Sequence, residues 1–183
     1  MLGFIKRNCK DFSDPLTLKS LYVSFVRSIL EYASPVWSPS YHCHSKRIES
    51  VQKQFLLFAL RRLPSARAIE FVLPPYQDRC NLLLLQRLDF RRDVASALFV
   101  RDIINSCVDC TELLARLKIY APERRMRQRD ALLLIDVVSN NFGLSEPILR
   151  ASRVFNLLYK VIDFQLSRDS LKKILFKFLL CYS

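Results

Sequence analysis

The residue types best able to bind a metal ion lie together in one short stretch. His42, Cys43 and His44 are consecutive, and Cys9 or Cys80 could complete a zinc site, because zinc takes His and Cys ligands and needs four for a closed tetrahedron. Three adjacent side chains cannot readily all point at one ion, and no second cysteine pair follows at zinc-finger spacing. We therefore expect ordinary thiols at these positions and no metal site.

Other catalytic chemistry also lacks its residues. Cys107 and Cys110 form a lone CxxC motif, which is a weak signal without a second pair. The only two histidines lie in one turn, so no Ser or Cys can be matched with a base and an orienting group. Two-metal nucleotidyl transfer needs closely placed carboxylates, and no two aspartates are adjacent. The sequence predicts no catalytic residue and no cofactor in this chain, which is expected not to be an enzyme by itself.

Basic side chains are the remaining candidates for function. The formal net charge of +12 favours an acidic partner, nucleic acid first and an anionic membrane surface second, although a solvated basic surface stays an open alternative. For the run over 124–129, a solvated loop and a localisation signal are further alternatives. The predicted nucleic-acid contacts are Arg61, Arg62, Arg91, Arg92, Arg124, Arg125, Arg127 and Arg129, with Lys172, Lys173 and Lys177 as a further basic cluster.

Two aromatic residues lie in a Pro-bounded turn over residues 34–44. Trp37, the only Trp of the chain, and Tyr41 could stack on bases if they were exposed. A lone Trp is more often buried in packing. We therefore predict that Trp37 anchors its turn against the core.

Composition limits the class of protein. A chain of 183 residues with a hydrophobic fraction of 51% can form a core, in one domain or two small ones. Only 2 glycines are present, which argues against an all-β, P-loop or Rossmann protein, since those rely on Gly for positive φ. No secretory signal is apparent, and no apolar run approaches the roughly 18 residues of a membrane span. We expect an intracellular protein, cytoplasmic or nuclear, with reduced and mostly buried thiols.

Hydrophobic periodicity predicts helices almost throughout. Asp14 is expected to cap a helix that begins at Pro15, buries Phe25 and Ile29 with other apolar residues, and ends near Ser34. A second helix over 46–62, capped by Ser45, would pack against it as an antiparallel hairpin. Further helices are predicted over 76–85, 86–106, 111–117, 146–161 and 167–180, the last three capped by Asp109 or Thr111, by Ser145, and by Ser167 or Asp169; residues 131–138 could be a strand or a short helix. The expected fold is all-α: a helical hairpin over 1–64 and further helices over 65–183, packed as one unit with at most minor strand content.

Several sequence blocks, taken together, carry a resemblance to a known family. The most specific are Glu31-Tyr32-Ala33-Ser34-Pro35-Val36-Trp37-Ser38-Pro39 and Arg47-Ile48-Glu49-Ser50-Val51-Gln52-Lys53. The other blocks are Leu2 to Arg7, Leu21-Tyr22, Ser28 to Leu30, Leu73 to Tyr76, Asp78 to Cys80, Arg91 to Asp93, Tyr120 to Pro122, Asn141 to Gly143, Glu146-Pro147, Asp163-Phe164 and Leu166 to Asp169. Together these blocks resemble the region downstream of the polymerase core in non-LTR, jockey-like LINE-type retrotransposon reverse transcriptases. The resemblance covers nearly the whole chain.

The resemblance implies a thumb and post-thumb region, a helical element that grips a primer–template duplex of RNA or DNA. It also implies that the palm, with its metal-binding aspartates and Mg²⁺, would lie upstream of Met1 and would be a packing partner. The chain is then expected to be a truncated or decayed element without polymerase activity or a small-molecule substrate. Two alternatives stay open: a helical module that binds a protein helix through the Phe55 to Leu60 face, and a relic without function.

Overall fold

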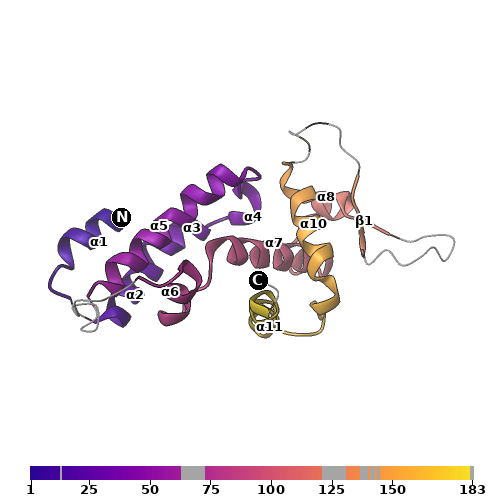
Figure 1. Cartoon of the computed structure of the whole chain (residues 1–183). Coiled ribbons are helices and arrows are strands. Elements are labelled where there is room, and N and C mark those ends of the chain that lie inside the picture. The colour runs from indigo at the N-terminus through magenta and orange to yellow at the C-terminus, as the bar shows by residue number, and fades with distance from the viewer. Residues whose placement is uncertain are drawn as a thin grey trace. The chain divides into compact units, whose positions relative to one another are not determined.

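Helices dominate the computed structural model of the protein, which describes residues 1–12, 14–62, 73–120, 131–136, 140, 143 and 145–181 (Figure 1). The one sheet among these residues pairs the short strands β1 (Lys118–Ile119) and β2 (Leu133–Leu134) in antiparallel register. The predicted all-α fold with minor strand content is confirmed. For residues 131–138 the sequence left a strand or a short helix open, and the described part, 131–136, contains the two-residue strand β2.

The chain divides into two compact units. Unit 1 comprises Met1–Tyr32 and Ser40–Asp89, and unit 2 comprises Ala33–Pro39 and Phe90–Ser183. The predicted division of the chain at residue 64 falls in the stretch 63–72, outside the described residues. The assignment of thumb-like and post-thumb parts therefore stays a prediction, as does their packing as one unit.

The first long helical stretch begins as predicted. The carboxylate of Asp14 accepts the backbone N–H groups of Leu16 at 3.1 Å and Thr17 at 2.9 Å, ahead of Pro15 at the first helical position. The stretch continues through α2 (Pro15–Tyr22), the π-helical turn η1 (Val23–Arg27) and α3 (Ser28–Glu31). It ends at Glu31 and not near Ser34, because Ala33 has a left-handed φ of 50°.

The π-helical turn changes which side chains face the core. Buried positions follow a spacing of four, through Leu18, Tyr22 and Val26. The wider π turn rotates the side chains within it and after it relative to an α-helix. Phe25 and Ile29, which the 3.6-residue period places in the core, are therefore 51% and 60% exposed, and that expectation is wrong.

The long helix α5 (His42–Leu60) packs against this stretch, as the predicted hairpin requires (Figure 1). The ring of Tyr22 stacks on Phe55 with centroids 4.1 Å apart. Phe55, Leu56 and Leu60 are fully buried in the core of unit 1. The helix begins earlier than predicted, with Tyr41 as N-cap, so Ser45 lies inside its first turn. Unit 1 also contains α1 (Leu2–Asn8), α6 (Tyr76–Leu82) and the first two residues of α7 (Leu88–Ile104).

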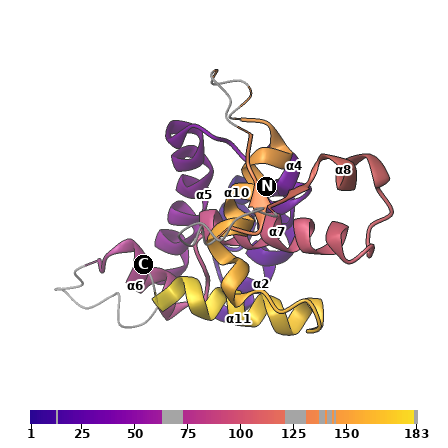
Figure 2. The same ribbon diagram turned by 90° about the vertical axis from the view of Figure 1, so that its right-hand side faces the viewer.

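Unit 2 is built around the rest of α7. Its other elements are α4 (Ser34–Trp37), α8 (Thr111–Arg116), β1, β2, α10 (Pro147–Leu158), the 3₁₀ turn η3 (Tyr159–Val161) and α11 (Arg168–Cys181). The core joins Val94 and Leu98 of α7 to Phe155 of α10 and Leu171 of α11. Figure 2 shows the chain turning from α10 through η3 into α11.

Two of the predicted helix caps in unit 2 are wrong. Cys110 is the N-cap of α8, where Asp109 or Thr111 was expected, and Glu146 is the N-cap of α10, in place of Ser145. In α10 the proline at the start explains the shift, because Pro147 fixes the first helical residue and so places the cap immediately before it. At α11, the hydroxyl of Ser167 accepts the backbone N–H of Ser170 at 3.3 Å, as the sequence predicts.

Candidate nucleic-acid interface

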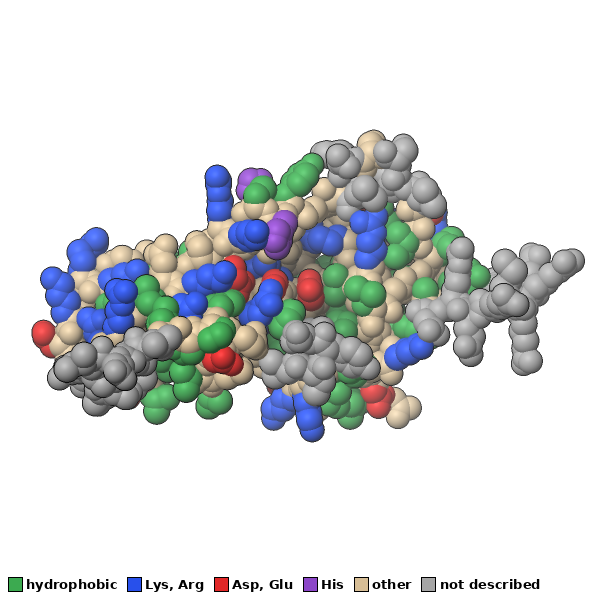
Figure 3. Space-filling view, in the orientation of Figure 1, with side chains coloured by type: hydrophobic (Ala, Val, Ile, Leu, Met, Phe, Trp, Pro, Cys, Tyr) green, Lys and Arg blue, Asp and Glu red, His purple; other side chains and the backbone are tan. Residues whose placement is uncertain are grey.

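A groove in unit 1 brings basic residues of two helix ends together. The C-terminal ends of α1 and α5 lie side by side, since Ile5 is buried in the same core as Phe55 and Leu56. The groove has a volume of about 420 Å³. Its lining residues are Lys6, Lys10, Gln54, Leu57, Phe58, Arg61 and Arg62. Figure 3 shows Lys and Arg side chains gathered over α1 and this end of α5. We call this feature the α1–α5 groove.

The guanidinium of Arg62 is fixed within the groove. Its Cζ lies 3.8 Å from the centroid of the Phe58 ring. Nη1 donates to the backbone carbonyl of Phe58 at 3.3 Å, and Nη2 donates to that of Lys10 at 3.3 Å. Arg62 thus caps the end of α5 and ties it to the end of α1.

The other groove cations are held less tightly. Lys6 Nζ donates to Gln54 Oε1 at 3.4 Å, while Lys10 and Arg61 are exposed. Among the residues that the structure describes, no Asp or Glu lines the groove. Helix C-termini carry partial negative charge, which favours cations at both helix ends. The four cations therefore have a local structural reason to be there and still leave a positive surface for an anion.

The structure places the other predicted arginines differently. Arg92 is only 3% exposed, so in this structure it cannot contact a phosphate, contrary to the sequence-based prediction. Its neighbour Arg91 is half-buried, with Cζ 5.3 Å from the centroid of the Phe176 ring. The remaining predicted contacts, Arg124, Arg125, Arg127 and Arg129, lie outside the described residues.

Lys6 and Lys10 were not among the predicted contacts, although they complete the groove. The signal for them is the basic ending of the first helix, Lys6-Arg7-Asn8-Cys9-Lys10. It becomes informative only once that helix is known to lie against the end of α5, and the spacing of residues along the chain does not provide this.

The aromatic turn is divided between the units. Trp37 in α4 keeps 39% of its surface exposed, so it is not a fully buried core residue; its anchoring role stays a prediction. Tyr41, which precedes α5, is 57% exposed and contacts His44 edge-on, with centroids 6.3 Å apart. The backbone of the turn is held inside unit 2, where Arg150 Nη2 donates to the carbonyl of Pro35 at 2.6 Å.

Residues from three of the resembling sequence blocks meet in a buried polar network of unit 1. Gln52 accepts the hydroxyl of Tyr22 at 3.2 Å and donates to the Tyr76 oxygen at 3.1 Å. Tyr76 in turn donates to Glu49, whose Oε1 also accepts the N–H of Leu88 at 3.1 Å. This network fixes α5, α6 and the start of α7 to one another.

The chemistry of this network is structural. Burial raises the pKa of the Tyr22 and Tyr76 phenols above the ordinary tyrosine value, and the hydrogen bond to Glu49 adds to the effect at Tyr76. Burial also raises the pKa of the Cys80 thiol, which opposes formation of a reactive thiolate. The network therefore keeps its hydroxyl and thiol groups neutral near pH 7.

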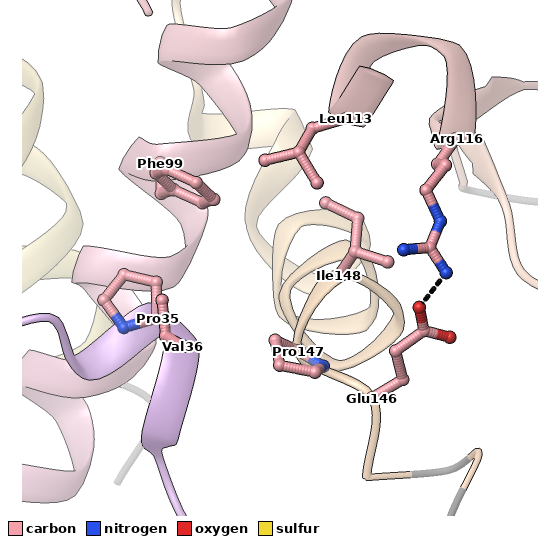
Figure 4. Close-up of a pocket in the computed structure, with 8 residues that line it drawn as sticks. All are labelled: Pro35, Val36, Phe99, Leu113, Arg116, Glu146, Pro147 and Ile148. Carbon is pink, nitrogen blue, oxygen red and sulfur yellow. Dashed lines mark hydrogen bonds and ion pairs between the residues drawn. The ribbon is translucent and has the colours of Figure 1, made fainter. Parts of the chain in front are cut away.

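A separate pocket lies within unit 2. Its apolar wall includes Phe99, Leu113 and Ile148, and an ion pair between Arg116 and Glu146 lies beside it (Figure 4). The volume of this pocket is about 220 Å³. The pocket offers a ligand a concave apolar surface. The two charged residues beside it, Arg116 and Glu146, are paired with each other.

The described residues hold no group of three or more His, Cys, Asp or Glu side chains placed to bind a metal ion.

The cysteines among the described residues are free thiols. Cys9 and Cys80 are buried, whereas Cys43 and Cys107 are exposed, so the expectation of mostly buried thiols is wrong. Among the helices that the structure describes, none has the length and apolar character needed to cross a bilayer.

Comparison with known proteins found no relative. The sequence matches no family model, no curated protein and no solved structure.

Proposed function

We propose that this chain is a non-catalytic nucleic-acid-binding protein that contacts the phosphate backbone through the α1–α5 groove. The observation that carries the proposal is the meeting of Lys6, Lys10, Arg61 and Arg62 around one hollow, with no carboxylate among the described residues that line it. Cations placed in this way release counterions when phosphates replace them, which favours binding without sequence preference. An intracellular location, where RNA and DNA are abundant, follows from the same proposal.

We further propose that the chain derives from the thumb and post-thumb region of a non-LTR retrotransposon reverse transcriptase. Support comes from the resembling sequence blocks, of which Glu31 to Pro39 and Arg47 to Lys53 are the most specific. In this proposal the palm would be a packing partner, and Mg²⁺ would belong to the palm. The isolated chain should not extend a primer in the presence of Mg²⁺, and primer extension would refute the non-catalytic part.

The binding proposal is tested by fluorescence anisotropy of a labelled oligonucleotide over a series of salt concentrations. Four phosphate contacts predict a slope of log affinity against log salt of about −2.8 for a single strand to −3.6 for a duplex. The variant Lys10→Ala/Arg61→Ala removes two exposed groove cations and should make the slope shallower by about 1.4 to 1.8. Binding that does not respond to salt, or no binding at low salt, would refute the proposal.

A matched control is available on the same helix. Lys46 and Arg47 are exposed in the first turns of α5, at the end opposite the groove. The variant Lys46→Ala/Arg47→Ala removes the same two charges and should leave the slope close to that of the unchanged protein. Equal losses in both variants would indicate that net charge, and not the groove, attracts the nucleic acid.

A second candidate function is a helical protein-interaction module. The face first considered for it is not available, because Phe55, Leu56 and Leu60 are buried within unit 1. A different apolar groove supports the candidate, lined by Met1, Leu2, Val26, Ile29, Leu30 and Val51 among others. Ile29 is 60% exposed there, and exposed apolar surface of this kind often marks an interface. Ile29→Glu should abolish binding to such a partner and leave nucleic-acid affinity unchanged.

A further inference from the structure

The floor of the α1–α5 groove differs in chemistry from its rim. Leu57 and Phe58 are half-buried and line the floor, whereas Lys10 and Arg61 are exposed at the rim. A duplex offers mainly phosphates and sugars to a surface that does not enter its grooves, so an apolar floor gains nothing from it. A single strand offers phosphates to cations and the faces of its bases to apolar and aromatic groups. The two-part lining therefore favours a single strand.

Arg62 adds a planar group at the point where floor and rim meet. Its guanidinium lies over the Phe58 ring with Cζ 3.8 Å from the centroid, and two backbone carbonyls hold its Nη atoms. A guanidinium held in this way has already lost much of the side-chain freedom that binding would cost it. Guanidinium planes stack on unpaired bases in single-stranded recognition. The arrangement prepares a stacking surface, which a phosphate contact alone would not need.

The size of the groove limits the ligand. Its volume of about 420 Å³ lies near the lower end of the range for small-molecule pockets, roughly 300 to 1,000 Å³. This is room for one nucleotide. The flanking phosphates of that nucleotide would then lie near the cations of the rim.

We infer that the α1–α5 groove binds one nucleotide of a single strand, with the base stacked on Arg62 above the apolar floor and the flanking phosphates on the cationic rim. The inference rests on the proposed nucleic-acid-binding function and narrows its ligand to unpaired RNA or DNA. Recognition through a base face does not depend on which base is present. The groove should therefore bind single strands of different sequence with similar affinity.

The test compares a labelled ten-residue thymidine oligonucleotide with a duplex of the same length, at one salt concentration, by anisotropy with the full chain. Arg62→Lys keeps the charge and removes the plane, and should weaken single-strand binding by about five- to tenfold, within the range of one lost stacking contact. Duplex binding should change by less than about twofold, since the phosphate contact is kept. Equal losses for both ligands, or no loss for either, would overturn the inference.

Arg61→Lys is the matched control for this substitution. Arg61 is exposed at the rim, so the same chemical change there should leave both affinities unchanged. A loss of single-strand binding in Arg61→Lys equal to that in Arg62→Lys would contradict the assignment of the stacking surface to Arg62.

A second probe needs no change in the protein. An oligonucleotide of the same length with abasic sites keeps the phosphates and removes the base faces. It should bind the unchanged protein about five- to tenfold more weakly than the thymidine strand, and Arg62→Lys should reduce its affinity no further. Equal affinity for the abasic and thymidine strands would overturn the inference while leaving the proposed function intact. Failure of both single strand and duplex to bind at low salt would overturn the proposed function as well.

Discussion

Glu49 Oε1 accepts the backbone N–H of Leu88 at 3.1 Å, so a carboxylate on α5 caps the start of α7. The same oxygen accepts the hydroxyl of Tyr76. Glu49 is 7% exposed, and a negative charge at a helix N-terminus is favourable. One buried side chain therefore connects three helical elements of unit 1.

Removing this carboxylate should destabilise the protein. Glu49→Ala leaves the Leu88 N–H and the Tyr76 hydroxyl without their acceptor, and should lower the free energy of unfolding by about 2 to 4 kcal/mol in urea denaturation. Glu112→Ala, an exposed carboxylate in the first turn of α8, is the control and should change it by less than about 0.5 kcal/mol. Similar values for the two variants would show that the Glu49 contacts contribute little.

Substitutions of Tyr22, which stacks on Phe55, can separate the contribution of ring packing to stability from that of hydrogen bonding. Tyr22→Phe keeps the ring, whose centroid lies 4.1 Å from that of Phe55, and removes the 3.2 Å bond to Gln52. It should lower the free energy of unfolding by about 1 kcal/mol, whereas Tyr22→Ala should lower it by about 3 to 5 kcal/mol. A loss in Tyr22→Phe as large as that in Tyr22→Ala would mean that the polar network, and not the ring, stabilises this site.

Asp102 should contribute strongly to the stability of unit 2. Its carboxylate is buried and lies 3.2 Å from Arg101 Nη1 and 3.0 Å from Arg168 Nη1. Asp102→Ala leaves the buried Arg101 without its counter-charge, which should reduce the free energy of unfolding by about 3 to 5 kcal/mol. Lys118→Ala, which breaks an exposed ion pair with Asp136, is the comparison and should cost at most about 1 kcal/mol.

Stability should fall at alkaline pH. Burial raises the pKa of Tyr22 and Tyr76 in the folded state, so the folded state keeps their protons where the unfolded chain loses them. The two protonated phenols stabilise the folded state fully below about pH 10, the pKa of tyrosine in the unfolded chain. This stabilisation is lost as the pH rises above that value. Urea denaturation between about pH 8 and 11, a range that brackets this value, should show that the free energy of unfolding falls as the pH rises. The fall should be smaller in the variant Tyr22→Phe/Tyr76→Phe. An identical decline in both proteins would refute this linkage.

Thiol labelling should follow exposure and acidity. Cys43 and Cys107 are exposed, whereas Cys80 is buried with a raised pKa and Cys9 is buried. Brief treatment of the native protein with iodoacetamide near neutral pH should modify Cys43 and Cys107 first, as read by mass spectrometry of peptides. Early modification of Cys80 would contradict its burial in the network.

Local signals in the sequence predicted much of the fold. The Asp14-Pro15 pair determines a helix start through contacts within four residues, and Ser167 does the same at α11. The apolar positions of α5 also predicted its packing in a hairpin, which the stacking of Phe55 on Tyr22 confirms. These features depend on neighbours in the chain or on one face of one helix, which is why periodicity detects them.

Features that depend on distant contacts were missed. The π turn at Val23–Arg27 moves Phe25 and Ile29 out of the core, and no residue type within the turn predicts it. Arg92 is buried, although the sequence offered it as a contact to nucleic acid. The groove needs the end of α1 beside the end of α5, a relationship fixed by Ile5 in the core.

The most direct test of the central claim is to map where a nucleic acid touches the chain. A photo-crosslinkable single-stranded oligonucleotide is bound to the full chain at low salt and irradiated, and the attached peptides are identified by mass spectrometry. Binding in the α1–α5 groove predicts cross-links within residues 1–12 and 54–62, and their loss in Lys10→Ala/Arg61→Ala. Cross-links confined to other parts of the chain, such as α10 or α11, would contradict the account.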